Sequence, residues 1–379
     1  MSNQKRFSTR VGVAVEQLLK TDRKKVLGPE QLQPSAPGLC VAGVLNAGFF
    51  TVGNRSFLVA RVDEVVDPGI AKRVKEQYGA EDVVPFFDYK ESALLAVPVN
   101  HPANYNPDSD VLLVSPGYPS PLDRQIYFAY LSHLRLIEID SAIASLDGTI
   151  VLAPSNKHDC YGCEDARSVV IEDTVTIAYN ALGICGSSIH RAQLRADFSV
   201  AAREMIFAPD QKHGCLFPQR IDGQLMIVTR PLVRTYVGAA GIWIYSSDEG
   251  SRWKVLGPLV LPRHDSVWDN VRVGPGPSPL LTEAGWLLLY YGVDHEKSYH
   301  VGAVLLDSKD PMQVIARTSN PILSPEFDWE LNGRRADTVF PSGAKLDGND
   351  RVTLYYGAAD TCVGVATFSL GELLSRMNP

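Results

Sequence analysis

The sequence predicts an all-β protein arranged as a five-bladed β-propeller. Its 379 residues are 45% hydrophobic, and its 30 glycines and 25 prolines are spread along the chain, which is typical of many short strands joined by turns. A unit of polar cluster, strand, turn and strand recurs at a spacing of roughly 50–65 residues, the length of a blade. Such units cannot each bury an apolar face alone, so we expect them to pack radially.

The strands of each unit follow in the same order along the chain. The first strand is an apolar or aromatic run of alternating character, at 55–63, 174–182, 224–231, 285–294 and 351–360. A second run follows each of these, at 133–148, 187–198, 241–253, 299–311 and 362–370. Polar clusters precede most first strands, at 162–168, 214–220, 274–281 and 339–345. A β-sandwich also has regularly spaced short strands and is the alternative fold, but a repeat of blade length favours the propeller.

Two segments interrupt this pattern. Residues 1–35 are expected to form an N-terminal extension to a single propeller domain of 36–379, with an amphipathic helix at 11–25 that packs on the outside. Residues 64–125 form a long insertion in the first blade, with a helix-like piece at 69–79. Insertions of this size commonly serve as a lid or as an oligomer contact. The sequence leaves both roles open, and with them a homo-oligomer.

The composition argues against several classes of protein. A formal net charge of −7 and a pI of about 5.7 indicate no nucleic-acid partner. No apolar run approaches the ~18–20 residues that span a bilayer, and the N-terminus lacks the apolar core of a signal peptide. We therefore expect a cytoplasmic protein with reduced cysteines. Cys160 and Cys163 form one CxxC pair, which supplies only two zinc ligands and opens no helix, so no metal or redox site is expected.

The repeat would bring polar residues from separate units to the central channel. They are Asn46, Arg61, Glu164, Asp165, Arg167, Lys212, Arg230, Arg272, Tyr299 and Asp360. Several cations facing one carboxylate pair in an acidic protein indicate an anionic ligand, and phosphate is the natural choice because arginine binds it bidentately. Inverting hydrolysis of a glycoside needs a second carboxylate to activate water. Phosphate is already an anionic nucleophile, so one acid and a cationic cradle suffice for phosphorolysis.

Longer motifs in the chain resemble glycoside hydrolase family 130. The matching segments are in order and at blade spacing, at 46–64, 142–148, 162–182, 212–231, 271–294, 302–323 and 339–367. The resemblance implies a five-bladed propeller with the activity of an inverting β-mannoside phosphorylase. By the same resemblance, the segment 46–64 looks closer to members that act on β-1,2-mannosides than to members that act on β-1,4-mannosides.

The resemblance also implies roles for individual residues. Asp165 would be the general acid, which protonates the glycosidic oxygen through the 3-hydroxyl of the substrate. Glu164 and Arg167 would hold Asp165 and bind sugar hydroxyls. The positions that match the mannosyl subsite are Asn46, Arg61 and Asp360, and those that match the phosphate cradle are Lys212, Arg230, Arg272 and Tyr299. Hydrolytic members of the family carry carboxylates in place of the cations of the cradle, so the presence of Lys212, Arg230 and Arg272 favours phosphorolysis.

Two positions depart from the family pattern. Ala166 stands where the family usually has proline, which would loosen the loop that holds Asp165. Tyr291 stands where many members have histidine, so one polar contact to phosphate or sugar is altered. Neither change removes a charge that phosphorolysis requires. Three histidines near the site segments are assigned no role, namely His190, His213 and His295.

The sequence therefore predicts an inverting phosphorylase that cleaves a β-mannoside with inorganic phosphate to give α-mannose 1-phosphate, or that runs in reverse to lengthen mannosides. Phosphate is the co-substrate, and no cofactor or metal is expected. Two alternatives remain open. One is a β-mannosyltransferase on the same fold that uses GDP-mannose, with the cradle holding the diphosphate. The other is a non-catalytic sugar-binding propeller, which would bind mannosides without releasing a product.

Overall fold

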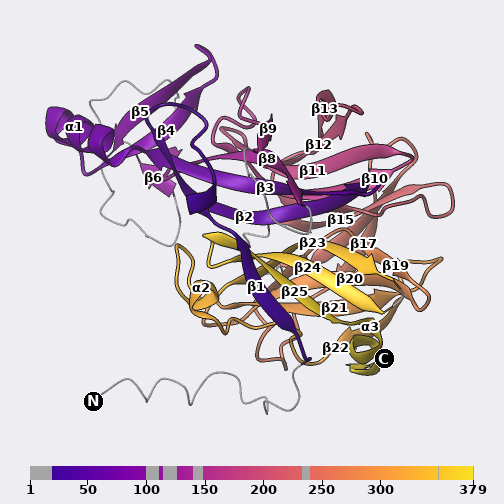
Figure 1. Ribbon diagram of the computed structural model, residues 1–379. Coiled ribbons are helices and arrows are strands. Elements are labelled where there is room, and N and C mark those ends of the chain that lie inside the picture. Colours follow the sequence, from indigo (N-terminus) through magenta and orange to yellow (C-terminus); the bar gives the residue numbers. More distant parts are fainter. Residues whose placement is uncertain are drawn as a thin grey trace, which may run out of the picture.

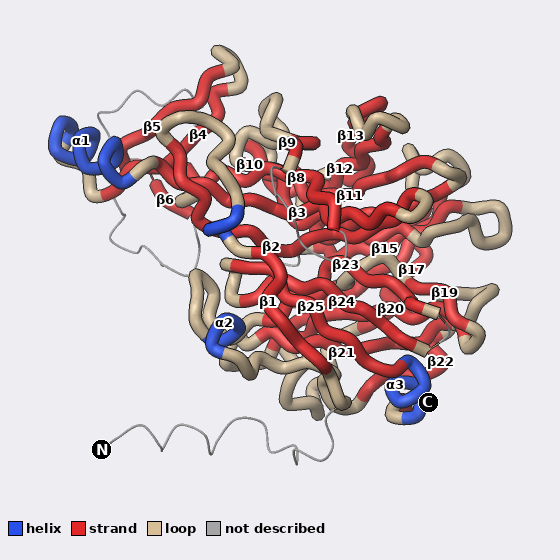
Figure 2. The backbone as a smooth tube through the Cα atoms, viewed as in Figure 1, coloured by secondary structure: helices blue, strands red, loops and turns tan. Residues whose placement is uncertain are grey.

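The computed structural model describes residues 19–99, 111–113, 126–139, 148–232, 240–348 and 350–378 (Figures 1 and 2). These residues form an all-β structure of several sheets, with three short α-helices at its periphery. No helix among them is long and apolar enough to cross a membrane. The all-β class predicted from the sequence is confirmed.

The first large sheet has two halves that meet edge to edge. One half contains β2 (Leu39–Val52), β3 (Arg55–Val66), β8 (Leu131–Ile139) and β9 (Thr149–Leu152). The other half contains β10 (Gly162–Ile171), β11 (Thr174–Gly183), β12 (Gly186–Leu194) and β13 (Val200–Phe207). Within each half the pairing is antiparallel, whereas a single parallel pairing between Gly162 and Ser132 links the halves.

The later strands form three further antiparallel sheets. One holds β14 (Gln211–Leu216), β15 (Leu225–Pro231), β16 (Ile242–Ser247) and β17 (Lys254–Val260). The next holds β18 (Arg272–Pro275), β19 (Leu280–Thr282), β20 (Gly285–Val293), β21 (Tyr299–Leu306), β22 (Val314–Thr318) and β26 (Met377–Asn378). The last holds β23 (Val339–Asp347), β24 (Arg351–Ala358), β25 (Cys362–Ser369) and β1 (Asp22–Leu27). The predicted polar clusters at 162–168 and 339–345 thus lie in β10 and β23, whereas those at 214–220 and 274–281 lie only partly in strands.

The N-terminal strand β1 completes the last sheet. Asp22 pairs with Thr367 and Leu27 with Val363, so β1 covers the free edge of β25. The helix predicted at 11–25 is therefore wrong for its last residues, which join a sheet instead of packing outside it. The unpaired backbone groups along an edge strand favour an extended partner over a helix whose amphipathic pattern is only local. Residues 11–18 lie outside the described residues. A 3₁₀ turn, η2 (Pro29–Gln31), leads towards β2.

The insertion in the first unit starts later than predicted, because β3 continues to Val66. It contains α1 (Pro68–Tyr78), the hairpin of β4 (Asp82–Asp88) and β5 (Ala93–Val99), and the pair β6 (Val111–Leu113) and β7 (Ile126–Phe128). The helix predicted at 69–79 is confirmed by α1, which Asp67 caps at its N-terminus. Phe86 of the hairpin contacts the rings of Tyr127 and Tyr161 at centroid distances of 5.1 and 6.1 Å. The hairpin therefore packs beside Tyr161, which lines the cavity described below.

Hydrophobic clusters fill the spaces between consecutive sheets. Each cluster draws buried side chains from two neighbouring groups of strands, as in Val59 with Ile177, Ile189 with Ile227, Val228 with Leu288, Leu289 with Leu354, and Val62 with Val363. Each fully buried aliphatic side chain contributes about 1.5–3 kcal/mol to folding. The remaining helices, α2 (Asp328–Leu331) and α3 (Leu370–Ser375), follow β22 and β25 in the chain.

Candidate active site

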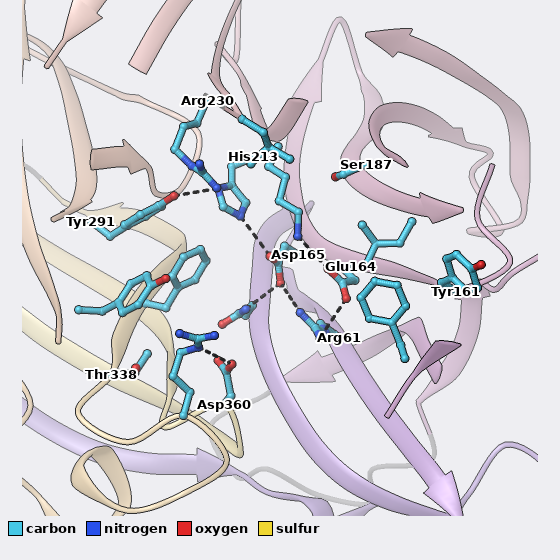
Figure 3. Close-up of a pocket in the computed structure, with 18 of the residues that line it drawn as sticks. Arg61, Tyr161, Glu164, Asp165, Ser187, His213, Arg230, Tyr291, Thr338 and Asp360 are labelled. Atoms are coloured by element: carbon cyan, nitrogen blue, oxygen red, sulfur yellow. Dashed lines mark hydrogen bonds and ion pairs between the residues drawn. The ribbon is translucent and has the colours of Figure 1, made fainter. Parts of the chain in front are cut away.

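A cavity of about 480 Å³ lies where the inner strands of the sheets converge (Figure 3). This size is within the range of small-molecule binding sites. The predicted site residues that line it are Asn46, Arg61, Glu164, Asp165, Lys212, Arg230, Arg272, Tyr291, Tyr299 and Asp360. They come from segments far apart in the sequence, as a radial arrangement requires. Arg167 is the predicted site residue that does not line the cavity.

Bulges in three inner strands aim side chains into this cavity. The pairing register shifts between Leu45 and Gly48 in β2, between Glu164 and Arg167 in β10, and between Lys212 and Cys215 in β14. Within these bulges Asn46, Asp165 and His213 adopt positive φ angles of 47°, 51° and 59°. A bulge inserts an extra residue and redirects its side chain, and Asn, Asp and His tolerate positive φ better than other residues with side chains. The local sequence of these strands therefore suits the backbone that the site needs.

Asp165 is surrounded by hydrogen-bond donors. Its Oδ1 accepts from Asn46 Nδ2 at 2.7 Å and from Arg61 Nη1 at 3.2 Å. Its Oδ2 accepts from Asn180 Nδ2 at 3.2 Å and lies 3.3 Å from His213 Nε2. Burial would raise the pKa of Asp165, but the His213 hydrogen bond and the positive charge of Arg61 outweigh it and hold this pKa well below its usual value. Asp165 is therefore ionised when no ligand is bound.

Fewer donors contact the carboxyl of Glu164 than that of Asp165, and its pKa shifts in the opposite direction. Its Oε1 lies 3.1 Å from Arg61 Nη2, and its Oε2 lies 3.5 Å from Lys212 Nζ. Burial raises the pKa of Glu164, and the opposing charges of Arg61 and Lys212 do not fully offset it. Adjacent buried carboxyls rarely ionise together. Of the two, Asp165 holds the negative charge more readily, because both of its oxygens accept direct hydrogen bonds.

Arg61 is itself held by a buried carboxylate that the sequence did not single out. Asp63 Oδ1 and Oδ2 accept from Arg61 Nε and Nη2 at 2.7 and 3.0 Å. Asp63 also accepts from Ser132 and from Arg334. Both guanidinium groups lie over the ring of Tyr130, whose centroid is 5.2 Å from Arg61 Cζ and 4.1 Å from Arg334 Cζ. Asp63 therefore positions Arg61 without lining the cavity itself.

The opposite wall carries two arginines, Arg230 and Arg272, which differ from Arg61 in their partners. Arg230 is only 6% exposed, and it pairs across β14 and β15 with another cation, Lys212. Among the described residues no carboxylate lies within ion-pair distance of Arg230 or Arg272, and the Nε atoms of both are buried without a hydrogen-bond partner. Arg272 Nη2 donates to the hydroxyl of Tyr299 at 2.5 Å. A buried, unpaired guanidinium is costly, so this wall is built to bind an anion.

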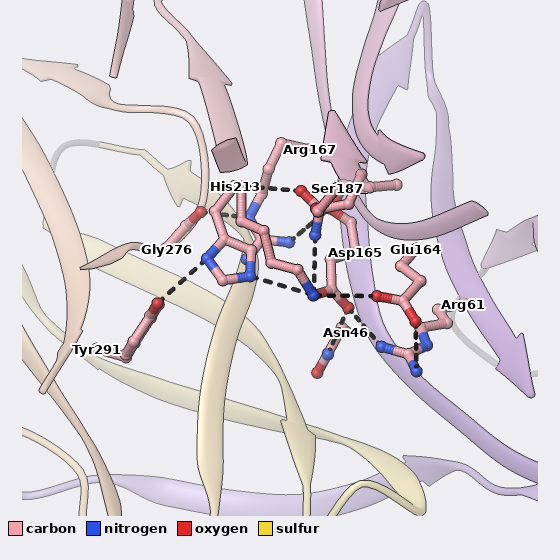
Figure 4. Close-up of polar contacts among 12 residues, drawn as sticks. Asn46, Arg61, Glu164, Asp165, Arg167, Ser187, His213, Gly276 and Tyr291 are labelled. Atoms are coloured by element: carbon pink, nitrogen blue, oxygen red, sulfur yellow. Dashed lines mark hydrogen bonds and ion pairs between the residues drawn. The ribbon is translucent and has the colours of Figure 1, made fainter. Parts of the chain in front are cut away.

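Arg167 has a structural position instead of the predicted contact with sugar hydroxyls. It is 1% exposed, and its guanidinium donates to the backbone carbonyls of Gly276, Asp165, Ala166 and Pro341 (Figure 4). Its charged group also lies over the ring of Phe340 at 5.3 Å. The predicted sugar contact of Arg167 is therefore wrong, because the guanidinium is occupied by carbonyls behind the bulge. It braces the backbone that presents Asp165, and Ala166 lies in strand β10 and not in a loop.

Several residues of the site were missed by sequence reasoning. His213 links Asp165 to Tyr291, whose hydroxyl lies 3.2 Å from His213 Nδ1. Tyr291 faces Gly274 across the β18–β20 pair, where an added Cβ would lie 2.2 Å from the Tyr291 hydroxyl, so only glycine fits. Arg335 lines the cavity and lies 3.6 Å from Asp360 Oδ2. The sequence offered one indication of a role for His213, namely its position directly after Lys212, a predicted site residue.

The two ends of the cavity differ in chemistry. The aromatic and apolar part of the lining consists of Phe128, Tyr130, Tyr161 and Leu182, and Tyr161 lies on the Glu164 side of the cavity, away from Arg230 (Figure 3). Burial raises the pKa of Asp360 despite nearby Arg334, Arg61 and Arg335. Among the described residues no cluster of His, Cys, Asp and Glu has the geometry to hold a metal ion. The arrangement therefore offers a sugar-sized space with the carboxyl groups of Asp165 and Glu164 on one side and an anion site on the other.

Comparison with known proteins shows that this chain is similar to mannoside phosphorylases. A family model described as β-1,4-mannooligosaccharide phosphorylase, that of glycoside hydrolase family 130, matches residues 134–378. The β-1,2-mannobiose phosphorylase of Listeria innocua is 31% identical over 368 residues, which cover 95% of this chain and 98% of that protein. The β-1,4-mannooligosaccharide phosphorylase of Ruminococcus albus is 31% identical over 179 residues, 45% of this chain and 52% of that one.

The solved structures show the same relationship. The structure of the Listeria innocua enzyme in complex with β-1,2-mannobiose has a TM-score of 0.81 and 29% identity, and the match covers 94% of this chain and 99% of that one. The match in both sequence and fold thus extends over nearly the whole length of both proteins. The chain belongs to glycoside hydrolase family 130.

Proposed function

We propose that this protein is an inverting phosphorylase that cleaves β-mannosides with inorganic phosphate. The observation that carries this proposal is a pair of arginines, buried Arg230 and half-buried Arg272, which have no carboxylate partner among the described residues and line the same cavity as Asp165. A hydrolase would need a second carboxylate to activate water. In the described part of this wall the unpaired groups are cations, and a bound phosphate would supply both the missing counter-charge and the nucleophile.

In the proposed reaction each wall has its own task. Lys212, Arg230, Arg272 and Tyr299 bind phosphate below the anomeric carbon. Asp165, once protonated, donates its proton through the 3-hydroxyl of the mannosyl residue to the glycosidic oxygen. The attack of a phosphate oxygen on C1 from the opposite face inverts the configuration and gives α-mannose 1-phosphate. Asn46, Arg61 and Asp360 hold the mannosyl hydroxyls, and Glu164 binds sugar on the aromatic side.

The proposed substrate is a β-1,2-linked mannoside. Support comes from the relative that matches this chain over almost its full length, which is named a β-1,2-mannobiose phosphorylase, and from the structure of that relative with β-1,2-mannobiose. The β-1,4-acting relative from Ruminococcus albus matches only 45% of this chain. Inorganic phosphate is the co-substrate in this proposal, and neither a metal nor an organic cofactor takes part.

The proposed architecture is a closed five-bladed propeller. The eight-stranded sheet divides at the parallel pairing of Gly162 with Ser132 into two antiparallel meanders, and three further sheets follow. The hydrophobic cluster that contains Val62 and Val363 joins the last sheet back to the first. The pairing of β1 with β25 provides the kind of closure that ties the two ends of a propeller together. This ring favours a central site such as the cavity described above.

The proposed function is tested by products. The protein is incubated with β-1,2-mannobiose and, separately, β-1,4-mannobiose, each with and without phosphate and with EDTA throughout. We expect mannose 1-phosphate only when phosphate is present, and faster turnover of the β-1,2-linked substrate. Release of free mannose alone, at a rate independent of phosphate, would contradict phosphorolysis. Activity with GDP-mannose in phosphate-free buffer would instead favour the transferase alternative.

A further inference from the structure

A line of polar contacts connects the cationic wall to the acid. The hydroxyl of Tyr291 lies 3.2 Å from His213 Nδ1, and His213 Nε2 lies 3.3 Å from Asp165 Oδ2 (Figure 4). Tyr291 lines the cavity together with Arg230 and Arg272, whose charges act on its phenol. The line therefore begins at the anion site and ends at the carboxyl. Both intermediate groups can accept one proton while they donate another.

The ionised carboxylate of Asp165 sets the order of donors along this line. A carboxylate only accepts, so Nε2 of His213 carries the hydrogen and Nδ1 accepts from the Tyr291 hydroxyl. Burial lowers the pKa of His213 to about 3, and the nearby charges of Arg230 and Arg167 act in the same direction, against the hydrogen bond to Asp165. The imidazole is thus neutral. It can pass a proton to Asp165 only by gaining one at Nδ1 as it loses the one at Nε2.

The groups around this line come from every strand packed against it. Those that face the imidazole are Asp165 and Arg167 on β10, Arg230 on β15, Tyr291 on β20 and the ring of Phe340 on β23. Those that face the carboxyl of Asp165 also include Arg61, Glu164 and, at longer range, Asp360. Cations therefore outnumber carboxylates on the side of the imidazole that faces the anion site. This excess favours movement of a proton away from a bound anion.

The proposed reaction needs a proton that the ligand-free site lacks. Asp165 must carry a proton to act as a general acid, yet four donors stabilise its ionised form. Asp165 is 5% exposed, and substrate in the cavity would cover that remaining surface. A proton that arrives from bulk water would have to enter before the sugar binds. An internal source avoids this problem.

We propose that phosphate itself supplies this proton, through Tyr291 and His213. The inference rests on the proposed phosphorolysis. Dihydrogen phosphate in the cradle gives a proton to the Tyr291 oxygen, the phenol proton passes to His213 Nδ1, and the Nε2 proton passes to Asp165 Oδ2. Each of the three acceptors gains one bond to hydrogen as each of the three donors loses one. Hydrogen phosphate dianion is left among Lys212, Arg230 and Arg272, where cations stabilise its second charge.

The catalytic cycle then closes without a further proton source. Neutral Asp165 releases its proton towards the leaving sugar, and the dianion forms the new bond to C1 while the glycosidic bond breaks. The products are the monoanion of mannose 1-phosphate, a sugar with a restored hydroxyl, and ionised Asp165. The total charge of phosphate and Asp165 is the same before and after the step. The next dihydrogen phosphate protonates Asp165 again.

The experiment compares kcat on β-1,2-mannobiose at saturating phosphate, between pH 5 and 9, for wild type, Tyr291→Phe and His213→Gln. Phenylalanine keeps the ring but removes the hydroxyl, and glutamine keeps a donor to Asp165 but cannot pass a proton between its two ends. Both variants must then protonate Asp165 from solvent. We expect the ratio of wild-type to variant kcat to rise with pH, to on the order of 10²-fold at pH 8. Phosphate binding, followed by the rise in melting temperature, should persist.

One further variant separates the proton path from packing. Tyr290→Phe is the matched control on the same strand, because Tyr290 is fully buried and its hydroxyl contacts Asp269 and Arg317 away from the cavity. This control should alter the melting temperature and leave the pH profile unchanged.

The outcomes distinguish failure of the path from failure of the proposed function. A wild-type enzyme that releases mannose 1-phosphate, with variant ratios that are constant across pH, would overturn the path and leave phosphorolysis intact. A pH-dependent loss in Tyr290→Phe equal to that in Tyr291→Phe would also overturn it. A wild-type protein with no phosphate-dependent turnover would overturn both.

Discussion

Replacing Arg230 with methionine should make the ligand-free protein more stable and weaken its binding of phosphate. Arg230 is 6% exposed, lies opposite Lys212 in the β14–β15 pair and has an unpartnered Nε. An uncompensated charge in such a site destabilises the folded state, and a hydrophobic group of similar volume removes that cost. We expect Arg230→Met to increase the free energy of unfolding by about 1–3 kcal/mol in phosphate-free buffer.

The same change should abolish much of the stabilisation by phosphate. A charge-assisted hydrogen bond contributes about 1.5–3 kcal/mol. Its loss corresponds to a dissociation constant for phosphate that is roughly 10–150-fold higher. Melting curves with increasing phosphate measure both effects together, because binding to the folded state alone raises the melting temperature with ligand concentration. The wild-type and variant curves should therefore cross as phosphate is added.

Arg317→Met is the matched control for this experiment. Arg317 donates to Asp269 at 2.7 Å and to the hydroxyl of Tyr290 at 3.0 Å, so it is a partly buried arginine that does have a carboxylate partner. Its removal should destabilise the protein by about 3 kcal/mol and leave the response to phosphate unchanged. If Arg230→Met were instead destabilising in phosphate-free buffer and kept the full phosphate response, Arg230 would be a structural residue and the assignment of the cradle would be refuted.

Three other substitutions test the remaining parts of the site. Asp165→Asn should abolish turnover of mannobiose. Because the pKa of Asp165 is depressed in the folded state, the stability that its charge contributes is present above the unfolded pKa of about 3.9 and is lost as pH falls through the folded pKa. The difference in melting temperature between wild type and variant should therefore shrink on acidification, and a constant difference would contradict the pKa shift. Lys212→Ala should raise the KM for phosphate far more than the KM for mannobiose, and equal effects would count against its place in the cradle. Asp63→Asn should destabilise by about 3 kcal/mol and reduce kcat/KM for mannobiose, because Arg61 and Arg334 lose their shared carboxylate; unchanged kinetics would show that Arg61 needs no such support.

The sequence predicted two strands of each repeated unit, and ten of the eleven predicted site residues line the cavity, for a physical reason. Each repeated unit presents one inner strand, and the polar cluster in that strand can reach the common centre only if the units pack radially. The clusters at 162–168 and 339–345 lie in β10 and β23 and contribute Asp165 and Phe340 to the cavity. The cations could be grouped because their charge stood out in an acidic chain. That Arg230 and Arg272 have no carboxylate partner among the described residues could be seen only in the structure.

The errors came from features that sequence spacing does not contain. Residues 165 and 167 are two apart and would share one face of a regular strand, but the bulge between Glu164 and Arg167 separates them. Asp165 therefore enters the cavity, while Arg167 binds carbonyls behind it. His213 was missed because its role depends on contacts with β10 and β20, which are remote in sequence. The amphipathic pattern at 11–25 was overridden by the free edge of β25, a long-range partner.

The most direct measurement of single-displacement phosphorolysis uses phosphate labelled with ¹⁸O and β-1,2-mannobiose, with the products followed by NMR from the first turnover. The expected result is mannose 1-phosphate with ¹⁸O in the bridging position and the α configuration at C1, with no label in free mannose. The β configuration, or cleavage at the same rate in the absence of phosphate, would contradict attack by a phosphate ion held in the cradle opposite Asp165.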